Sequence, residues 1–256
     1  MLRAMSSNGR VVWYELLTSD PTGAVAFYTD VIGWKAEAWG ADYTMFVGGQ
    51  GPLGGVTQLP EQAKAMGAPP YWQGSIQVAS VDATVEKVKE LGGKVYVVET
   101  VPEVGRLAVV ADPQGAVVSV FTPDREMPPH DLAKDGEVSW HELYTTNNEA
   151  AFEFYRQIAG WEKLSSFDMG PMGQYLIWGR DGRQLGGMMT MPKEMKQPPG
   201  WLYYVTTSDL EGTLARATAR GAKVLNGPMH VPTGQQIVQL LDPQGAAFAL
   251  VTPPKG

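Results

Sequence analysis

Hydrophobic and polar positions along the start of the chain follow first a strand pattern and then a helix pattern. Residues 11–18 are β-branched, aromatic and apolar, which is typical of a strand. Asp20 and Pro21 then provide a helix N-cap followed by proline at the first helical position. Apolar residues recur at spacings of three and four up to Ile32, and Gly33 can end the helix. The pattern predicts one strand followed by one amphipathic helix.

Shorter apolar runs, separated by glycine and proline, predict two groups of three strands in the rest of the first half. A further strand at 74–79 and a helix at 82–91 lie between the groups, and Gly92 can cap that helix. The order strand, helix, three strands therefore occurs twice. The two groups of predicted strands are residues 35–39, 43–47 and 55–59, then 94–98, 106–111 and 117–122.

The second half of the chain repeats the first. The segment 13–34 matches the segment 140–161 with a constant shift of 127, and nine of its 22 positions are identical. A period this long indicates a duplicated domain and not a solenoid repeat. We predict a first domain at 11–122, a linker at 123–137 and a second domain at 138–253. Later motifs also return: Leu53-Gly54-Gly55 as Leu185-Gly186-Gly187, and Asp112-Pro-Gln-Gly-Ala116 as Asp242-Pro-Gln-Gly-Ala246.

Composition narrows the function classes. A length of 256 residues suits two ordinary domains, and no apolar run reaches the roughly 18 residues that a membrane span requires. A net charge of -7 without a Lys/Arg cluster argues against nucleic acid as a partner. The chain has no cysteine, which excludes thiolate metal sites and cysteine nucleophiles. The N-terminus lacks the apolar segment of a secretory signal, so the expected location is the cytoplasm.

The repeated motifs resemble a known superfamily. The capped helix with Phe27 and Tyr28, the Gly-Trp after it, the Gly-Gly strand and the Asp-Pro-Gln-Gly-Ala turn are similar to glyoxalases, bleomycin resistance proteins and extradiol dioxygenases. This group is called vicinal oxygen chelate. The resemblance covers 11–122 and 138–253. It implies an α+β fold of two tandem glyoxalase-like domains, each made of paired βαβββ units that form a cup-shaped mixed sheet with helices outside.

The resemblance also identifies the positions at which family enzymes bind metal. These enzymes carry His, Gln or Glu at the head of the first strand of each unit, and Glu in the last strand. A catalytic metal normally needs about three protein ligands. At the matching positions this chain has Trp13, Gln73 and Ser119 in the first copy, and Trp140, Leu202 and Ala249 in the second. Neither copy has the His and Glu set, so we expect no metal cofactor.

Glu15 and Glu142 are the candidate catalytic residues. Residues two apart on a strand share a face, so each glutamate points to the same side as Trp13 or Trp140. A carboxylate beside an indole can hold an organic cation. In apolar surroundings its pKa rises, which suits a general base. The alternative is structural, because a buried carboxylate is usually bonded to a tyrosine, an indole N–H or a backbone amide.

Three hypotheses for function remain open, and the sequence does not decide whether the protein is an enzyme. The first is a metal-free cup that binds a small, largely apolar organic molecule, organic cations included. The second is a metal-dependent lyase, isomerase or dioxygenase that binds Mn, Fe, Ni, Zn or Mg through Glu15 and Gln73. The third is that only one copy keeps a site. The ligand-binding candidates are Trp13, Glu15, Gln73, Ser75, Ser119, Trp140, Glu142 and Tyr204.

Histidines and methionines are assigned structural roles. His130 lies in the predicted linker, His230 in a proline-flanked loop, and His141 on the strand face opposite Glu142. The methionines that follow Gly187 fit an adaptable ligand wall, although core packing is the more frequent role. The expected partner is a small molecule, and the expected assembly is a monomer or homodimer.

Overall fold

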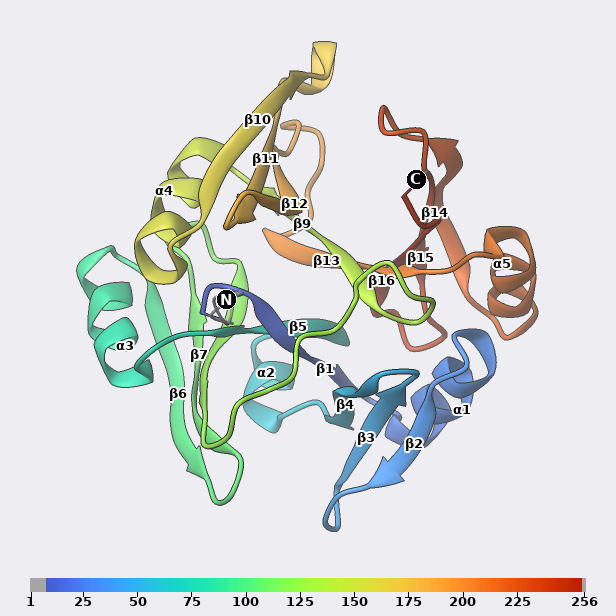
Figure 1. The fold of residues 1–256 in the computed structure, drawn as a ribbon, viewed down its shortest axis with the longest axis horizontal. Coiled ribbons are helices and arrows are strands. Elements are labelled where there is room, and N and C mark those ends of the chain that lie inside the picture. Colours follow the sequence, from blue (N-terminus) through green and yellow to red (C-terminus); the bar gives the residue numbers. More distant parts are fainter. Residues whose placement is uncertain (1–7, 255–256) are drawn as a thin grey trace, which may run out of the picture. The chain divides into compact units, whose positions relative to one another are not determined.

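The computed structural model describes residues 8–254 and shows the same order of strands and long helices in both halves (Figure 1). Each half contains two βαβββ units, as the repeat predicts. The first half consists of β1 (Val11–Thr18), α1 (Pro21–Val31), β2 (Lys35–Ala38), β3 (Tyr43–Gly48), β4 (Gly51–Gln58), α2 (Glu61–Ala65), β5 (Tyr71–Gln77), α3 (Val81–Glu90), β6 (Lys94–Val101), β7 (Gly105–Ala111) and β8 (Val117–Pro123). The second half consists of β9 (Val138–Thr145), α4 (Asn148–Ala159), β10 (Glu162–Asp168), the 3-10 helix η1 (Gly170–Met172), β11 (Gln174–Arg180), β12 (Arg183–Thr190), β13 (Gly200–Thr206), α5 (Leu210–Ala219), β14 (Lys223–His230), β15 (Gln236–Leu241) and β16 (Ala247–Val251).

Each half contributes one open, eight-stranded mixed sheet. The strand order is β2-β3-β4-β1-β5-β8-β7-β6 in the first half and β10-β11-β12-β9-β13-β16-β15-β14 in the second. In both sheets the first and fourth strands of a βαβββ unit pair in parallel, while the hairpin strands pair antiparallel. The predicted α+β fold with two tandem glyoxalase-like domains is therefore confirmed.

The described residues form two compact units that do not follow the two copies. Unit 1 contains residues 8–13, 74–129 and 141–201, and unit 2 contains residues 14–73, 130–140 and 202–254. Each unit thus combines one βαβββ unit from each copy. The helices α3 and α4 pack together in unit 1, as α1 and α5 do in unit 2. The domain limits inferred from the repeat remain predictions.

Local sequence signals account for the helix limits. The Asp20 side chain accepts a hydrogen bond from the Gly23 N–H at 2.9 Å and caps α1. Asn147 caps α4 in the same way through the Ala150 N–H. Gly160 ends α4 with a φ of 68°, a left-handed conformation that glycine adopts without a steric penalty.

Some predicted limits were wrong by a few residues. The N-cap of α3 is Ser80, so this helix begins one residue before the predicted start. The strand β4 begins at Gly51, within the segment predicted to be a turn, and β5 begins at Tyr71 instead of Gly74. The five-residue helix α2 was not predicted, because a single turn gives too short a period to recognise.

The repeated Phe-Tyr and Asp-Pro-Gln-Gly motifs join the two copies inside unit 2. The Tyr28 hydroxyl donates to the Asp242 carboxylate at 3.1 Å and accepts from the Trp72 indole at 2.9 Å. Asp242 also accepts the backbone N–H groups of the turn that follows it. Burial raises the pKa of the Asp242 carboxyl, and the Ala246 N–H opposes this shift.

Unit 1 contains the same network with the roles of the copies exchanged. The Tyr155 hydroxyl donates to Asp112 at 3.2 Å and accepts from the Trp201 indole at 3.3 Å. The Trp161 indole donates to the Gly9 carbonyl at 2.6 Å, as the Trp34 indole of unit 2 donates to the Gly136 carbonyl at 2.8 Å. Both tryptophans are buried. The repeated motifs are therefore mainly structural.

The end of the predicted linker, residues 130–137, is part of unit 2. His130 Nδ1 lies 2.8 Å from the buried carboxylate of Glu137, and the Asp135 carboxylate accepts from the backbone and hydroxyl of Ser208. Asp131 exchanges two hydrogen bonds with the Gln50 side chain. Within residues 8–254, no helix is long and apolar enough to cross a membrane.

Candidate functional site: a carboxylate–phenol pair on the open face

The helices cover one face of each sheet, and we call the opposite face the open face. The helix α4 packs on β11 and β12. Trp178 of β11 points to this helix side, where it stacks on Trp161 with ring centroids 3.6 Å apart. Because side chains alternate along a strand, Tyr175 and Ile177 of β11 point to the open face.

The same alternation places every predicted ligand-binding residue on an open face. Trp72 of β5 and Trp201 of β13 bond to helix tyrosines, so the residues next to them point the other way. Tyr14 of β1 packs edge-on against Tyr203 on the helix side. Their roles in binding remain predictions. The residues are Trp13 and Glu15 on β1, Gln73 and Ser75 on β5, Ser119 on β8, Trp140 and Glu142 on β9, and Tyr204 on β13.

Glu142 forms the best-defined polar contact on an open face. Its carboxylate accepts a hydrogen bond from the Tyr175 hydroxyl at 2.7 Å, and its side chain belongs to a residue only 7% exposed. Gly187 of β12 is paired with Glu142. A Cβ at Gly187 would overlap the Tyr175 ring, so only glycine lets this ring lie across β12 and reach the carboxylate. The expected structural bond between the glutamate and a tyrosine is thus present in the second copy.

The first copy has the same geometry around Glu15. Gly55 of β4 is paired with Glu15, and a Cβ at Gly55 would overlap the Tyr43 ring. The ring of Tyr43 therefore lies across β4 beside Glu15. Trp39 packs edge-on against Tyr43, with the ring centroids 5.8 Å apart.

Tyr43 and Tyr175 were missed by the sequence analysis, although a signal was present. Each tyrosine precedes its glycine, Gly55 or Gly187, by the same number of residues. The repeat therefore contained the pair, but a tyrosine on a neighbouring strand looks like an ordinary core residue until the strand register is known.

The other predicted residues have different surroundings in the two copies. Ser75 and Ser119 are directly paired in unit 1, and the Ser119 hydroxyl donates to the Ala108 carbonyl at 3.2 Å. In unit 2, Tyr204 stands opposite Ala249, and its hydroxyl accepts from the Gln239 amide at 2.6 Å.

Gln73 has an unsatisfied polar atom. Its side chain is buried on the open face, and its Oε1 has no hydrogen-bond partner among residues 8–254. A buried carbonyl without a partner is costly, by roughly 1–3 kcal/mol, so such an atom marks a place where a bound donor would be stabilising.

The donor set does not fit a family metal centre. Two of the six family positions, Gln73 and Ser119, carry an oxygen, and the Ser119 hydroxyl already donates to a carbonyl. In the described part of the chain, no three His, Asp or Glu side chains lie close enough to hold a metal ion. Glu15 and Gln73, the predicted alternative ligands, supply fewer residues than the three that catalytic sites normally use.

His141 lies on the helix side of β9, as the alternation predicts. It is buried, contacts the Trp178 ring, and its Nδ1 lies 2.6 Å from the Leu185 carbonyl. Burial lowers the pKa of His141 to about 4, so this imidazole is neutral at pH 7 and its Nδ1–H donates to Leu185. A general-base role on the open face is excluded for this residue by its position.

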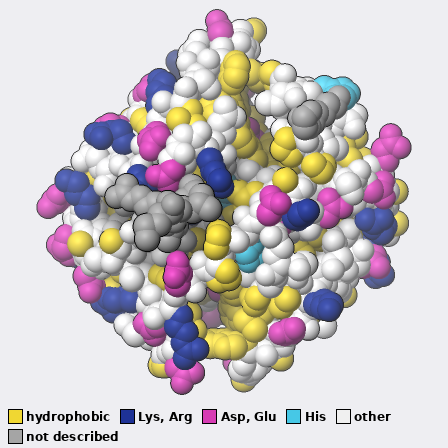
Figure 2. All heavy atoms as spheres, viewed as in Figure 1, with side chains coloured by type: hydrophobic (Ala, Val, Ile, Leu, Met, Phe, Trp, Pro, Cys, Tyr) yellow, Lys and Arg dark blue, Asp and Glu magenta, His cyan; other side chains and the backbone are white. Residues whose placement is uncertain are grey.

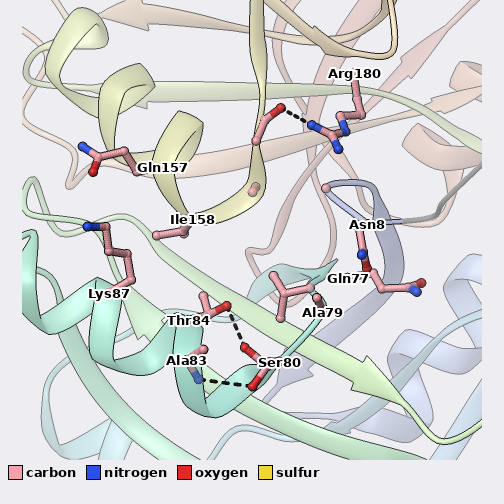
Figure 3. Close-up of a pocket in the computed structure, with 14 residues that line it drawn as sticks. Asn8, Gln77, Ala79, Ser80, Ala83, Thr84, Lys87, Gln157, Ile158 and Arg180 are labelled. Atoms are coloured by element: carbon pink, nitrogen blue, oxygen red, sulfur yellow. Dashed lines mark hydrogen bonds between the residues drawn. The ribbon is translucent and has the colours of Figure 1, made fainter.

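A cavity of about 360 Å³ lies elsewhere, on the helix side of unit 1 (Figure 3). It is bounded by the start of α3 and the end of α4, where the Ser80 side chain caps the Ala83 N–H and Arg180 donates to the Gly160 carbonyl. Its charged lining residues are Lys87 and Arg180. None of the predicted site residues lines it.

Comparison with known proteins gives the family. A model of the Glyoxalase/Bleomycin resistance protein/Dioxygenase superfamily matches residues 137–250, and a model of the glyoxalase-like domain matches residues 13–121. A putative glyoxylase, CFP32 of Mycobacterium bovis, is 30% identical over 98% of this chain and 97% of its own length. The chain therefore belongs to the glyoxalase, bleomycin resistance and dioxygenase superfamily, with two tandem domains. The predicted family is confirmed.

Other relatives and solved structures agree with this assignment. The anthracycline biosynthesis protein DnrV of Streptomyces peucetius is 27% identical, covering 95% of this chain and 93% of its own. The Mn(II)-bound glyoxalase of Novosphingobium aromaticivorans has a TM-score of 0.68 at 15% identity, covering 98% of this chain and 84% of that one. The 2,3-dioxygenase LapB of Pseudomonas sp. KL28 has a TM-score of 0.69 at 12% identity, with coverages of 98% and 94%. At these identities the structural likeness shows the fold alone.

Proposed function

We propose that the second copy binds a small, largely apolar organic molecule on its open face, with Glu142 and Tyr175 as the polar anchor. The observation that carries this proposal is a nearly buried carboxylate whose phenol partner is held in place by an otherwise unnecessary glycine, Gly187. A hydroxyl or ammonium group of the ligand would bond to this pair, and its apolar part would cover the surrounding strands.

The position of the pair favours binding over a purely structural role. The tyrosine–aspartate bonds that join the repeated motifs, such as that of Tyr155 with Asp112, lie on the helix side. Glu142 instead points away from the helices, and desolvation there strengthens any hydrogen bond that a ligand makes. The repeat of glutamate, tyrosine and glycine in the first copy, with the orphaned Oε1 of Gln73, supports the same proposal.

The relatives are compatible with this function. One is named a putative glyoxylase and another an anthracycline biosynthesis protein, so both names point to small organic molecules. Neither name fixes a ligand for this chain, because superfamilies with one fold host many chemistries.

Calorimetric titration of matched variants tests the proposal. The probes are menthol, an apolar neutral alcohol, and benzyltrimethylammonium, an apolar cation. We expect Glu142→Gln to weaken the binding of at least one probe by about tenfold, since a hydrogen bond to a charged group contributes about 1.5–3 kcal/mol. Glu15→Gln is the matched control in the first copy. Equal affinity of both variants and the wild type for any probe that binds, or binding of neither probe, would count against the proposal.

Metal analysis separates this proposal from the metal-dependent alternative. The protein is incubated with excess Mn, Fe, Ni, Zn or Mg in turn, desalted and analysed by mass spectrometry. The metal-dependent reading predicts about one retained ion per chain, and predicts that Glu15→Gln or Gln73→Leu abolishes retention. Retention that survives both substitutions would assign the ion to other residues.

A further inference from the structure

Four side chains form a continuous row across the open face in the second copy, and we call them the aromatic row. The strand pairing places Phe167 of β10 opposite Tyr175 of β11, Tyr175 opposite Met189 of β12, and Met189 opposite Tyr144 of β9. Directly paired residues point to the same face of a sheet, so the four side chains stand side by side. All four belong to unit 1.

The outer end of the aromatic row is exposed. Phe167 lies on the edge strand and is 44% exposed, and Met169 and Met172, which follow it, are exposed as well. Figure 2, drawn from the same side as Figure 1, shows hydrophobic side chains over this β10–β11 hairpin. Large apolar side chains gathered at the surface mark an interaction site more often than isolated ones do.

The inner end of the row reaches the polar anchor. Tyr175 belongs both to the row and to the pair with Glu142, so a molecule lying along the row would meet a phenol and a carboxylate. The next row, formed by Ser165, Ile177, Gly187 and Glu142, contains a glycine over which the Tyr175 ring lies. The site combines apolar side chains with one group of polar atoms.

The dimensions and chemistry of the row define the kind of molecule that it fits. Four strands at the usual spacing span about 14 Å, close to the length of about three or four fused aromatic rings. Aromatic rings favour edge or offset contact with other rings, and methionine adapts to an irregular outline. The row itself carries no Lys, Arg, Asp or Glu, which favours a neutral ring system.

We propose that the second copy takes a planar, polycyclic aromatic molecule that carries a hydroxyl group, with its rings along the aromatic row and its hydroxyl at Glu142 and Tyr175. This inference rests on the proposed function and names its ligand class. The first copy offers less apolar surface, because the row there is Trp39, Tyr43, Thr57 and Leu17. Its two aromatic residues lie at the outer end, and Thr57 and Leu17 replace Met189 and Tyr144.

The test uses emodin, a planar tricyclic phenol, with menthol as the non-planar alcohol, in calorimetric titrations of the full chain. We expect emodin to bind more tightly than menthol, and Phe167→Ser to weaken emodin about three- to tenfold, since aromatic pairs contribute about 0.5–1.5 kcal/mol. Phe167 is exposed, so this variant should fold. Trp39→Ser, an exposed aromatic residue next to Tyr43 in the first copy, should leave emodin binding unchanged.

A second variant replaces part of the row with the residues of the first copy. Met189→Thr with Tyr144→Leu should weaken emodin by about tenfold or more and menthol by less, because the alcohol contacts fewer row residues. If emodin affinity is unchanged in both row variants while Glu142→Gln still lowers menthol affinity, the aromatic ligand class is wrong and the proposed function stands. If Glu142→Gln affects neither probe, the proposed function itself fails. Weakening of emodin by Trp39→Ser and not by Phe167→Ser would move the site to the first copy and overturn the inference.

Discussion

The two copies share a glutamate, a glycine and a tyrosine on the open face, but their surroundings differ. Glu15 and Glu142 stand opposite glycines that admit a tyrosine ring. Around this common element the second copy carries Phe167, Met189 and Tyr144, whereas the first copy offers Thr57 and Leu17 at the last two positions. Duplication has thus kept the polar group that needs a special backbone and has changed the apolar side chains around it.

The second βαβββ unit of each copy also differs on the open face, in the size of its polar side chains. In the first copy two small residues, Ser75 and Ser119, are directly paired. In the second copy Tyr204 and Gln239 fill the equivalent row with a phenol–amide hydrogen bond. We infer that the copies have diverged toward different ligand shapes on a shared core.

The largest expected effect concerns the core that both copies share. Trp161 stacks on Trp178 at 3.6 Å, while its counterpart Trp34 is tilted against Phe46 at 5.2 Å. Trp161→Ala should lower the free energy of unfolding by about 3–5 kcal/mol, and Trp34→Ala by less, because it loses fewer close contacts. Urea unfolding of both variants measures the difference. A greater loss for Trp34→Ala would contradict the ranking.

A slightly smaller effect is the pH dependence of folding stability, which His141 causes in the second copy alone. The pKa of His141 is lowered from its ordinary value of 6.5 to about 4, so the unfolded chain takes up a proton first as pH falls. The stability contribution is complete above pH 6.5 and is lost as pH falls toward 4, by up to about 3 kcal/mol. The first copy has Tyr14 at this position, which does not titrate in that range.

The comparison of wild type with His141→Gln isolates this contribution. The pKa values of Asp112 and Asp242 are raised by burial, which gives stability at low pH that is lost as pH rises. Both aspartates are present in both proteins, so their contributions cancel in the difference between the two unfolding free energies. A difference in unfolding free energy that stays constant between pH 4 and 6.5 would show that His141 is not the cause.

A moderate effect on binding is expected from the glycine that admits Tyr175. In Gly187→Ala the new methyl group displaces the ring and breaks its bond to Glu142, so emodin affinity should fall about tenfold. Gly55→Ala is the matched change, and should leave emodin affinity within about twofold. The fitted number of binding sites per chain in each titration also shows what fraction of the variant is folded. Equal losses in both variants would remove the proposed difference between the copies.

The smallest effect concerns the filled row of the second copy. Tyr204→Phe removes the oxygen that accepts from Gln239, and should lower the free energy of unfolding by about 1 kcal/mol. Ser75→Ala in the first copy should change it by less than about 0.5 kcal/mol, since the side chain is small and only half buried. Thermal unfolding can resolve this pair, and an equal loss in both would argue that the rows are equivalent.

The order of strands and helices could be predicted because capped helices and alternating strands are local features, and the resemblance of the repeated motifs to the superfamily supplied the fold. Asp20, Asn147 and the Gly-Trp ends define the helices within a few residues. Strand alternation also predicted that Trp13 and Glu15, like their copies, share one face of the sheet. What local pattern cannot supply is the pairing of strands. The contact of Tyr175 with Glu142 depends on the register of β11, β12 and β9.

The exchange of βαβββ units between the copies was also beyond the sequence. The hydrogen bond from Tyr28 to Asp242 joins residues far apart in the chain, and neither motif contains a sequence signal that predicts the pairing. The same holds for Tyr155 and Asp112. Long-range contacts of this kind are set by packing, which composition and periodicity do not encode.

A crystal structure of the full chain with emodin would show the binding site itself. We expect one molecule along the aromatic row of the second copy, with a hydroxyl oxygen within hydrogen-bonding distance of Glu142 or Tyr175. Glu15 and Tyr43 of the first copy should carry no ligand. Emodin bound at another surface, or bound along the row with no polar contact to this pair, would contradict the account.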